Sequence, residues 1–192
     1  ISEDSTIIDM LQHCVSQRGE HVIATVTALD GDLDSIVLGK SFYFDTHTST
    51  LKDCAHKGLR SFMVDQITDV LENKKSKTYH FDFENIKASV FIEFIPPQYH
   101  LAIYGDNYDV YPMLEMAKVM DWEVSLVGNI QKLKKEKLQS VANFYPKNLK
   151  ERPEIDNRTA IILMAHDYKT DSTNLLDLIK IKAPYIASLG PR

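Results

Sequence analysis

The stretch 159-TAIILM-164 is a continuous apolar run near the end of the chain. A strand that is covered by helices on both faces typically has such a continuous apolar sequence, because neither face meets water. The run therefore predicts a buried strand of a parallel sheet. A helical pattern follows from about Ser172 to Ile181, and a second short apolar run follows from Tyr185 to Leu189. This strand–helix–strand order is the repeating unit of a doubly wound fold.

The same rhythm extends toward the N-terminus. Short apolar runs alternate there with helical patterns, and we expect strands at Leu101–Tyr104, Glu123–Val127 and Ala142–Tyr145 and helices at about Pro112–Met120 and Lys132–Gln139. Together with the C-terminal elements, these predict a Rossmann-like parallel-sheet domain over residues 98–192.

The first half of the chain has a different pattern. An amphipathic helix is expected over residues 3–18 and a second helix over Gly58–Asn73, with β-branched or alternating segments between and after them at His21–Leu29, Ser41–Asp45, Thr78–Phe83 and Ala88–Ile95. The last two segments are expected to be antiparallel neighbours. Pro96-Pro97 then interrupts any strand ladder. We therefore place a domain boundary there and predict an N-terminal mixed α+β domain over residues 1–97.

Composition excludes several classes of protein. The chain has 192 residues with 22 Lys and Arg against 27 Asp and Glu, a net charge of −5. This balance, with no basic stripe, argues against a nucleic-acid partner. No apolar run approaches the ~20 residues of a membrane helix, so no membrane partner is expected. The two cysteines, Cys14 and Cys54, suit a reducing cytoplasm rather than a disulfide framework.

In a doubly wound sheet, ligands bind at the carboxyl ends of the strands. The first such end carries 104-YGDNYD-109. The equivalent turn of a dinucleotide fold has three glycines, whereas this one has only Gly105. Asp106 and Asp109 place carboxylates where a phosphate would lie, which opposes an anion. The alternative is that Gly105 permits a tight turn and that Asp109 caps the next helix.

The second strand of the domain ends in Val127-Gly128-Asn129. A dinucleotide fold normally has an acidic residue here that holds the adenosine ribose. Asn129 could still donate to a hydroxyl group, but the carboxylate contact is missing. Binding of NAD(P) is therefore possible on the fold but disfavoured by the residues.

The segment 165-AHDY-168 directly follows the buried run. A His166–Asp167 pair at a strand's carboxyl end is well placed for proton transfer or for holding a polar ligand. The alternative is a solvent-facing loop in which Asp171 caps the following helix.

Three further features could suggest a functional site, but each has a simpler structural explanation. Asp45, His47, Asp53, Cys54 and His56 cluster in sequence, but their spacing matches no standard zinc pattern, and a polar loop is the preferred interpretation. Cys54 could accept sulfur, although a buried cysteine is commoner. The lysine-rich run 132-KLKKEK-137 is interpreted as a solvated helix face. Hydrolase, kinase and zinc-site motifs are absent, so we expect no catalytic residue and no metal site.

Four segments of the second half carry a family resemblance. They are Pro96-Pro97 followed by 101-LAIYG-105, then 122-WEV-124, 159-TAIILMAHDYKTD-171 and 184-PYIASLGPR-192. In this order they are similar to the xanthine dehydrogenase accessory proteins of the XdhC/CoxI type. The family's Gly-Ala-Gly-His turn corresponds to residues 105–108. Its Thr-His-Asp segment corresponds to residues 165–167, with Asp171 after it, and its glycine-rich C-terminal segment corresponds to residues 185–192.

The resemblance implies that the protein is an accessory factor and not an enzyme with catalytic turnover. Such a protein binds the molybdenum cofactor (molybdopterin), protects it during sulfuration and delivers it to a xanthine dehydrogenase-type molybdenum hydroxylase. It implies a homodimer that also meets a cysteine desulfurase. The residues expected at the cofactor are Gly105, Asp106, Asn107, Tyr108, Asn129, His166, Asp167 and Gly190.

Two other functions remain open at this point. One is an NAD(P)-dependent oxidoreductase, and the other is a divergent scaffold with a vestigial nucleotide pocket. The chain also ends just after an expected strand, where the family continues. We therefore expect either a short member of the family or a C-terminal segment that is missing from this sequence.

Overall fold

The computed structural model describes residues 5–31, 36–83, 86–147, 151–181 and 183–189. The chain divides into two compact units, Ile1–Pro97 and Gln98–Arg192, which are described separately. Within the described residues, no helix combines the length and the apolar character needed to cross a membrane.

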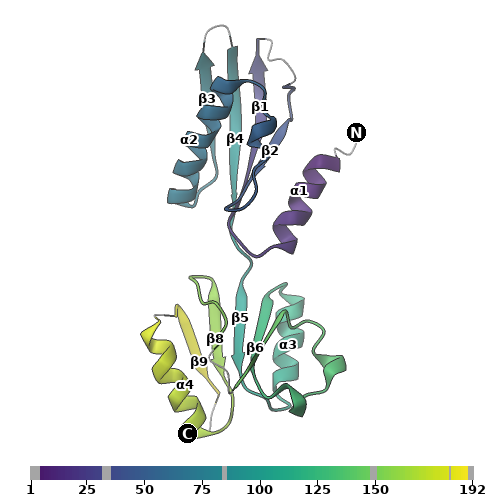
Figure 1. Ribbon diagram of the computed structural model, residues 1–192, viewed down its shortest axis with the longest axis vertical. Helices are drawn as coiled ribbons and strands as arrows, with labels where there is room; N and C mark the ends of the chain where they lie inside the picture. Colours follow the sequence, from purple (N-terminus) through teal and green to yellow (C-terminus); the bar gives the residue numbers. More distant parts are fainter. Residues whose placement is uncertain (1–4, 32–35, 84–85, 148–150, 182, 190–192) are drawn as a thin grey trace. The chain divides into compact units, whose positions relative to one another are not determined.

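The first unit is an antiparallel sheet with two helices (Figure 1). Its elements in chain order are α1 (Ser5–Ser16), β1 (His21–Asp30), β2 (Ser41–Phe44), the 3₁₀ turn η1 (Leu51–Asp53), α2 (Lys57–Asn73), β3 (Lys77–Phe83) and β4 (Ile86–Ile95). The strand order is β2-β1-β4-β3. β3 and β4 are antiparallel neighbours, as the sequence predicts.

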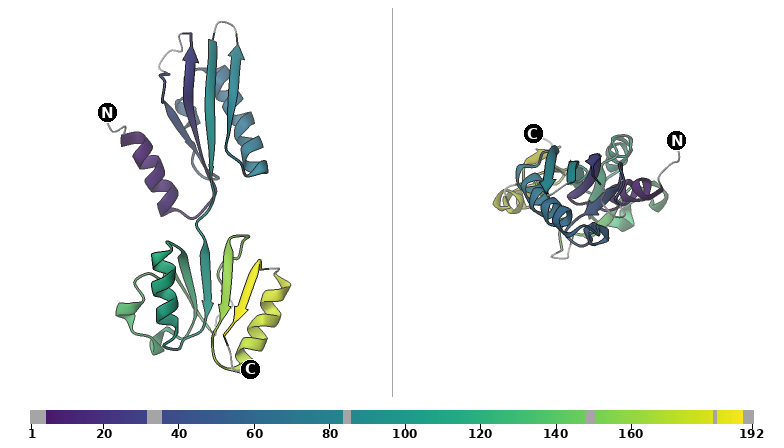
Figure 2. Two further views of the ribbon diagram at one scale, coloured as in Figure 1. Left: turned by 180° about the vertical axis from the view of Figure 1, so that it is seen from behind. Right: turned by 90° about the horizontal axis from the view of Figure 1, so that it is seen from above.

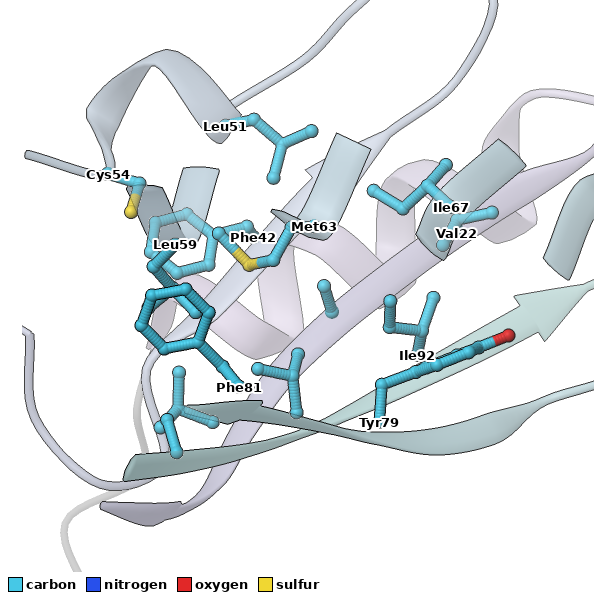
Figure 3. Close-up of a cluster of buried hydrophobic side chains, with 14 of the residues drawn as sticks. Val22, Phe42, Leu51, Cys54, Leu59, Met63, Ile67, Tyr79, Phe81 and Ile92 are labelled. Atoms are coloured by element: carbon cyan, nitrogen blue, oxygen red, sulfur yellow. The ribbon is translucent and has the colours of Figure 1, made fainter. Parts of the chain in front are cut away.

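Alternation along the strands divides the core of this unit between two faces. On one face, Val22 of β1 and Ile92 of β4 pack against Leu59, Met63 and other apolar side chains of α2 (Figure 3). The next residue of β1, Ile23, points to the opposite face and belongs to a separate and smaller cluster under α1. The two helices therefore cover opposite faces of the sheet, and α2 covers the larger core.

The second unit is a parallel sheet of five strands. Its elements are β5 (His100–Tyr104), α3 (Val110–Val119), β6 (Glu123–Gly128), the 3₁₀ turns η2 (Ile130–Lys132) and η3 (Lys135–Lys137), β7 (Asn143–Pro146), β8 (Thr159–Leu163), α4 (Tyr168–Lys180) and β9 (Tyr185–Ser188). The strand order is β7-β6-β5-β8-β9. From β5 the chain winds outward in one direction through β6 and β7, and then returns beside β5 as β8. This is the doubly wound, Rossmann-like order that the sequence predicts.

The central strand β5 is buried along its whole length. Leu101 and Ile103 belong to the core that includes α3, whereas Ala102 and Tyr104 belong to the core that includes α4. The helices consequently flank the sheet on its two faces, as Figure 2 shows from behind. This double cover explains the continuous apolar runs of β5 and β8.

The prediction of a helix over Lys132–Gln139 is wrong. This segment forms the 3₁₀ turns η2 and η3, whose amides bond three residues back, as Leu138 N does to Lys135 O at 3.0 Å. Leu133 and Leu138 are both buried in the core with α3. In an α-helix a spacing of five residues would turn the second leucine about 140° away from the first. Two short turns let both leucines face the core.

Two glycines allow the carboxyl ends of β5, β6 and β8 to approach closely. A Cβ atom on Gly105 would lie 2.6 Å from the carbonyl oxygen of Met164, and one on Gly128 would lie 2.8 Å from the carbonyl oxygen of Gly105. The strand ends are held by bonds from Gly105 N to Val127 O at 3.0 Å and from Met164 N to Tyr104 O at 2.8 Å. Close packing of backbone, rather than turn conformation, therefore requires glycine at 105.

We predict that Gly105→Ala destabilises the second unit by about 1–3 kcal/mol, because the new methyl group meets a backbone carbonyl that cannot rotate away. Trp122 is the only tryptophan of the chain and lies in the second unit, so its fluorescence during urea unfolding reports this unit. Gly19→Ala, in the first unit, is expected to leave this transition unchanged, since its Cβ would meet nothing nearer than 3.7 Å. Equal stability of Gly105→Ala and wild type would contradict the packing argument.

Candidate functional site

A pocket of about 170 Å³ lies at the carboxyl edge of the parallel sheet. The ends of β5, β6 and β8 and the first turns of α4 supply part of its wall, through Tyr104, Gly105, Asp106, Asn107, Val127, Gly128, Ala165, Asp167, Thr170 and Asn174. The pocket lies where the winding of the sheet reverses between β5 and β8. This is the position at which doubly wound folds bind their ligands.

Three cationic side chains complete the wall: Lys132, Lys147 and Arg152. They come from the connection between β6 and β7 and from the segment after β7. The wall carries two carboxylates, Asp106 and Asp167, and therefore one net positive charge. Lys147 is directed by a hydrogen bond from its Nζ to Thr170 Oγ1 at 3.2 Å. The pocket is suited to an anion.

Asp106 ties two strand ends together instead of repelling an anion. Its Oδ2 accepts a hydrogen bond from Asn129 N at 3.0 Å, and its Oδ1 accepts one from Lys132 Nζ at 3.0 Å. Partial burial alone would raise the pKa of Asp106, but the bonds from Lys132 and the Asn129 amide outweigh burial and lower it. The expectation that this carboxylate opposes an anion is corrected, because Lys132 neutralises its charge.

Asp167 begins α4. Its carboxylate accepts hydrogen bonds from Thr170 N at 2.8 Å and from Thr170 Oγ1 at 2.5 Å, and these bonds lower its pKa. The alternative in which Asp171 caps this helix is wrong. Asp171 lies inside the first turn of α4, buried to 7% exposure, and its Oδ1 accepts a hydrogen bond from Ala165 N at 3.2 Å. Asp171 therefore orients the end of β8 rather than the start of the helix.

His166 pairs with a residue that is distant in sequence. Its Nε2 is hydrogen-bonded to the carboxylate of Asp109 at the start of α3, and Asp109 makes no side-chain cap of that helix. His166 also has a φ of 56°, a left-handed conformation that side chains rarely adopt. Asn107 Nδ2 adds a bond to Ala165 O at 3.1 Å. These contacts join the turns after β5 and β8, and His166 and Asp167 have different partners.

The structure brings together four of the residues expected at a ligand. Gly105, Asp106, Asn107 and Asp167 line the pocket. Asn129 lines an adjoining open hollow of about 740 Å³, and its side-chain oxygen accepts a hydrogen bond from Gln131 N at 3.1 Å. Neither His166 nor Tyr108 lines the pocket or the adjoining hollow, and Tyr108 is 83% exposed. Gly190 lies outside the described residues.

Sequence reasoning missed the cations of the pocket. Lys132 was interpreted as part of a solvated helix face, and Lys147 and Arg152 belong to no motif. Their only sequence signal is their place between the second and fourth strands of a doubly wound unit. That signal does not distinguish them from the other lysines of the same segment.

The polar cluster around residues 45–56 has local structural roles. His56 Nδ1 accepts a hydrogen bond from Leu59 N at 3.0 Å at the start of α2, and Asp45 Oδ1 accepts bonds from the amides of His47 and Thr48. Cys54 is fully buried, and burial raises the pKa of its thiol. Among the described residues, no three His, Cys, Asp or Glu side chains are placed to hold a metal ion.

Comparison with known proteins identifies the second unit. Residues 101–192 match the family model of the XdhC Rossmann domain, and this part of the chain belongs to that family. A crystal structure described as a xanthine dehydrogenase from Bacillus halodurans is similar at 13% sequence identity and a TM-score of 0.49, covering 96% of this chain and 82% of that one. No curated protein sequence matches the chain significantly.

We predict that Lys147→Met weakens binding of inorganic phosphate to the pocket about tenfold, because a charge-assisted contact is lost. Isothermal titration calorimetry measures the effect. Lys135→Met is the matched control, since Lys135 lies in η3 of the same connection but does not line the pocket. Equal weakening in both variants would show that only overall charge matters, which would contradict a defined site.

Proposed function

With the XdhC Rossmann family as the premise for residues 101–192, we propose that this protein binds the molybdenum cofactor as cargo and passes it to a xanthine dehydrogenase-type hydroxylase. In this role the protein binds the cofactor and releases it unchanged, and it does not catalyse a reaction. The observation that carries the proposal is the cationic pocket at the carboxyl edge of the parallel sheet.

Molybdopterin ends in a phosphate monoester, and the pocket offers the groups that such a phosphate needs. Lys132, Lys147 and Arg152 line it, and the first turns of α4 form one wall. The N-terminus of α4 adds partial positive charge to the charge of these side chains. Phosphate contacts of this kind are strong yet reversible, as a carrier requires.

The space beside the pocket suits the rest of the cargo. A third hollow, of about 320 Å³, shares Tyr104, Arg152 and Asn174 with the cationic pocket. Its remaining wall includes apolar side chains from two segments, Pro153, Ile155, Leu178 and Ile181. A flat heteroaromatic ring system such as a pterin fits a partly apolar hollow, with Arg152 placed between the ring and the phosphate.

Sulfuration of the cargo is assigned in this proposal to a partner enzyme. Cys54 is fully buried, its thiol donates to His56 O at 3.6 Å, and burial raises its pKa. A sulfur acceptor needs an exposed and readily ionised thiol. The resemblance to the XdhC/CoxI family implies a cysteine desulfurase as the partner that supplies the sulfur. We further propose a homodimer as the loaded form.

Binding of NAD(P) is the weaker alternative. The turn after β6 has Asn129 in place of the acidic residue that holds a ribose, and the Asn129 side-chain oxygen already accepts the Gln131 amide. The turn after β5 carries the Asp106 side chain where a dinucleotide fold needs bare backbone. These two features favour a cargo with one phosphate at the pocket.

The test combines binding with transfer. Purified protein is titrated with isolated molybdenum cofactor under anaerobic conditions, and the loaded protein is mixed with an apo-hydroxylase. We expect saturable binding and recovery of hydroxylase activity, with both lowered about tenfold in Lys147→Met. NAD and NADP, titrated in parallel, are expected to bind weakly or not at all.

The role of Asp167 needs a substitution that preserves the helix start. Asp167→Ser retains a side-chain oxygen for the Thr170 amide, whereas Asp167→Ala removes it. Cofactor binding by Asp167→Ser is expected to equal or exceed that of wild type, because one negative charge leaves the pocket. Absence of cofactor binding by folded wild-type protein would overturn the proposal and favour a scaffold with a vestigial pocket.

A further inference from the structure

Tyr104, the last residue of the central strand β5, borders two hollows. It lines the cationic pocket of about 170 Å³ and also the third hollow of about 320 Å³ beside it. Its neighbours in the core include Val127, which lines the cationic pocket, and Leu178, which lines the third hollow. The phenol therefore lies at the junction of the two hollows, and packing on both sides holds it there.

The hydroxyl group of Tyr104 has no hydrogen-bond partner in the part of the chain that the structure describes. Tyr104 is 3% exposed, and a tyrosine buried to this degree normally has such a partner. Three side-chain atoms of the described residues are enclosed without a partner: Asp109 Oδ1, Arg158 Nε and Asp171 Oδ2. The Tyr104 oxygen is not one of them, so it keeps contact with solvent through the hollows that Tyr104 lines.

Two other polar side chains line both hollows, Arg152 and Asn174. Asn174 lies on the second turn of α4, is partly buried, and offers an amide donor and a carbonyl acceptor. Burial raises the pKa of Tyr104, and the positive charge of Arg152 offsets only part of this rise. The phenol is therefore neutral and protonated near pH 7, and its hydroxyl is able to donate a hydrogen bond.

We propose that Tyr104 is a specificity-determining residue of this site, whose hydroxyl donates a hydrogen bond to the ligand where its phosphate joins a planar ring body. The inference rests on the proposed function, from which it takes a ring-bearing phosphate monoester as the ligand class. With the phosphate in the cationic pocket and the ring in the third hollow, the atoms between them pass Tyr104, Arg152 and Asn174. Ester and linker oxygens are acceptors for a phenol. Inorganic phosphate has no atoms at this point, so Tyr104 favours the monoester over the free ion.

A tyrosine with a purely structural role would behave differently. Ring packing alone is satisfied equally well by phenylalanine, and a hydroxyl buried without a partner is unfavourable. Tyr104→Phe is therefore expected to leave the midpoint of urea unfolding unchanged or to raise it, as measured by Trp122 fluorescence. A lowered midpoint would show that the hydroxyl has a partner within the chain, and it would overturn the inference.

The binding test is isothermal titration calorimetry of the full chain with two probes, inorganic phosphate and guanosine 5′-monophosphate. The second probe has a phosphate monoester, a linker with hydroxyl groups, and an aminopyrimidinone ring of the kind found in pterins. Wild type is expected to bind it about tenfold more tightly than inorganic phosphate. Tyr104→Phe is expected to lose about tenfold in affinity for the monoester and to keep its affinity for inorganic phosphate within about twofold.

Tyr145→Phe is the matched control, because Tyr145 packs in the same core as Tyr104 but lines neither hollow. This variant is expected to bind both probes as wild type does. Equal losses for both probes in Tyr104→Phe would place the hydroxyl on the phosphate itself, and no loss for either probe would remove it from the site. Either result would overturn the inference, as would wild-type protein that binds the monoester no more tightly than inorganic phosphate.

Failure of this inference is distinguishable from failure of the proposed function. If wild type does not bind molybdenum cofactor, the proposed function is overturned, whereas a selective loss of monoester binding in Tyr104→Phe would still support the role of Tyr104. If wild type binds and transfers the cofactor but Tyr104→Phe binds both probes as wild type does, the proposed function stands and the role of Tyr104 is overturned.

Discussion

The second unit depends on the close approach of backbone at the carboxyl ends of β5, β6 and β8. Gly105 lies against the Met164 carbonyl, and Gly128 lies against Gly105, so that neither position has room for a side chain. This contact fixes where the turns after β5 and β8 begin. The bonds from Asn107 to Ala165 and from His166 to Asp109 then join the two turns. The candidate pocket is the space that these packed strand ends leave open.

Charge around the pocket is arranged by pairing. Asp106 holds Lys132 at the wall, and Thr170 joins Asp167 and Lys147 through its amide and hydroxyl groups. Both carboxylates are committed to structural bonds, which leaves the cations to set the character of the site. A pocket of this kind accepts a phosphate without the three glycines that a dinucleotide turn needs, because side chains replace the backbone amides as donors.

Much of the fold could be predicted from sequence, since apolar patterning reports burial directly. The run 159-TAIILM-164 identifies a doubly covered strand, and alternation identifies the β3–β4 hairpin. The lysine-rich segment could not be predicted as 3₁₀ turns, because only the position of the core shows that Leu133 and Leu138 must face the same way. The pairing of His166 with Asp109 was hidden for the same reason, since 57 residues separate them. The sequence indicates which strand ends carry polar groups, but the partners of those groups are set by packing.

The central claim is that the carboxyl-edge pocket of the XdhC-type unit receives the phosphate of a pterin cargo. Chemical-shift mapping of the ¹⁵N-labelled protein during titration with molybdenum cofactor tests it most directly. The account predicts that the perturbed amides cluster around Gly105, Lys132, Lys147 and Thr170, all of which line one pocket. Perturbations confined to the first unit, or to the α3 face of the sheet, would contradict it.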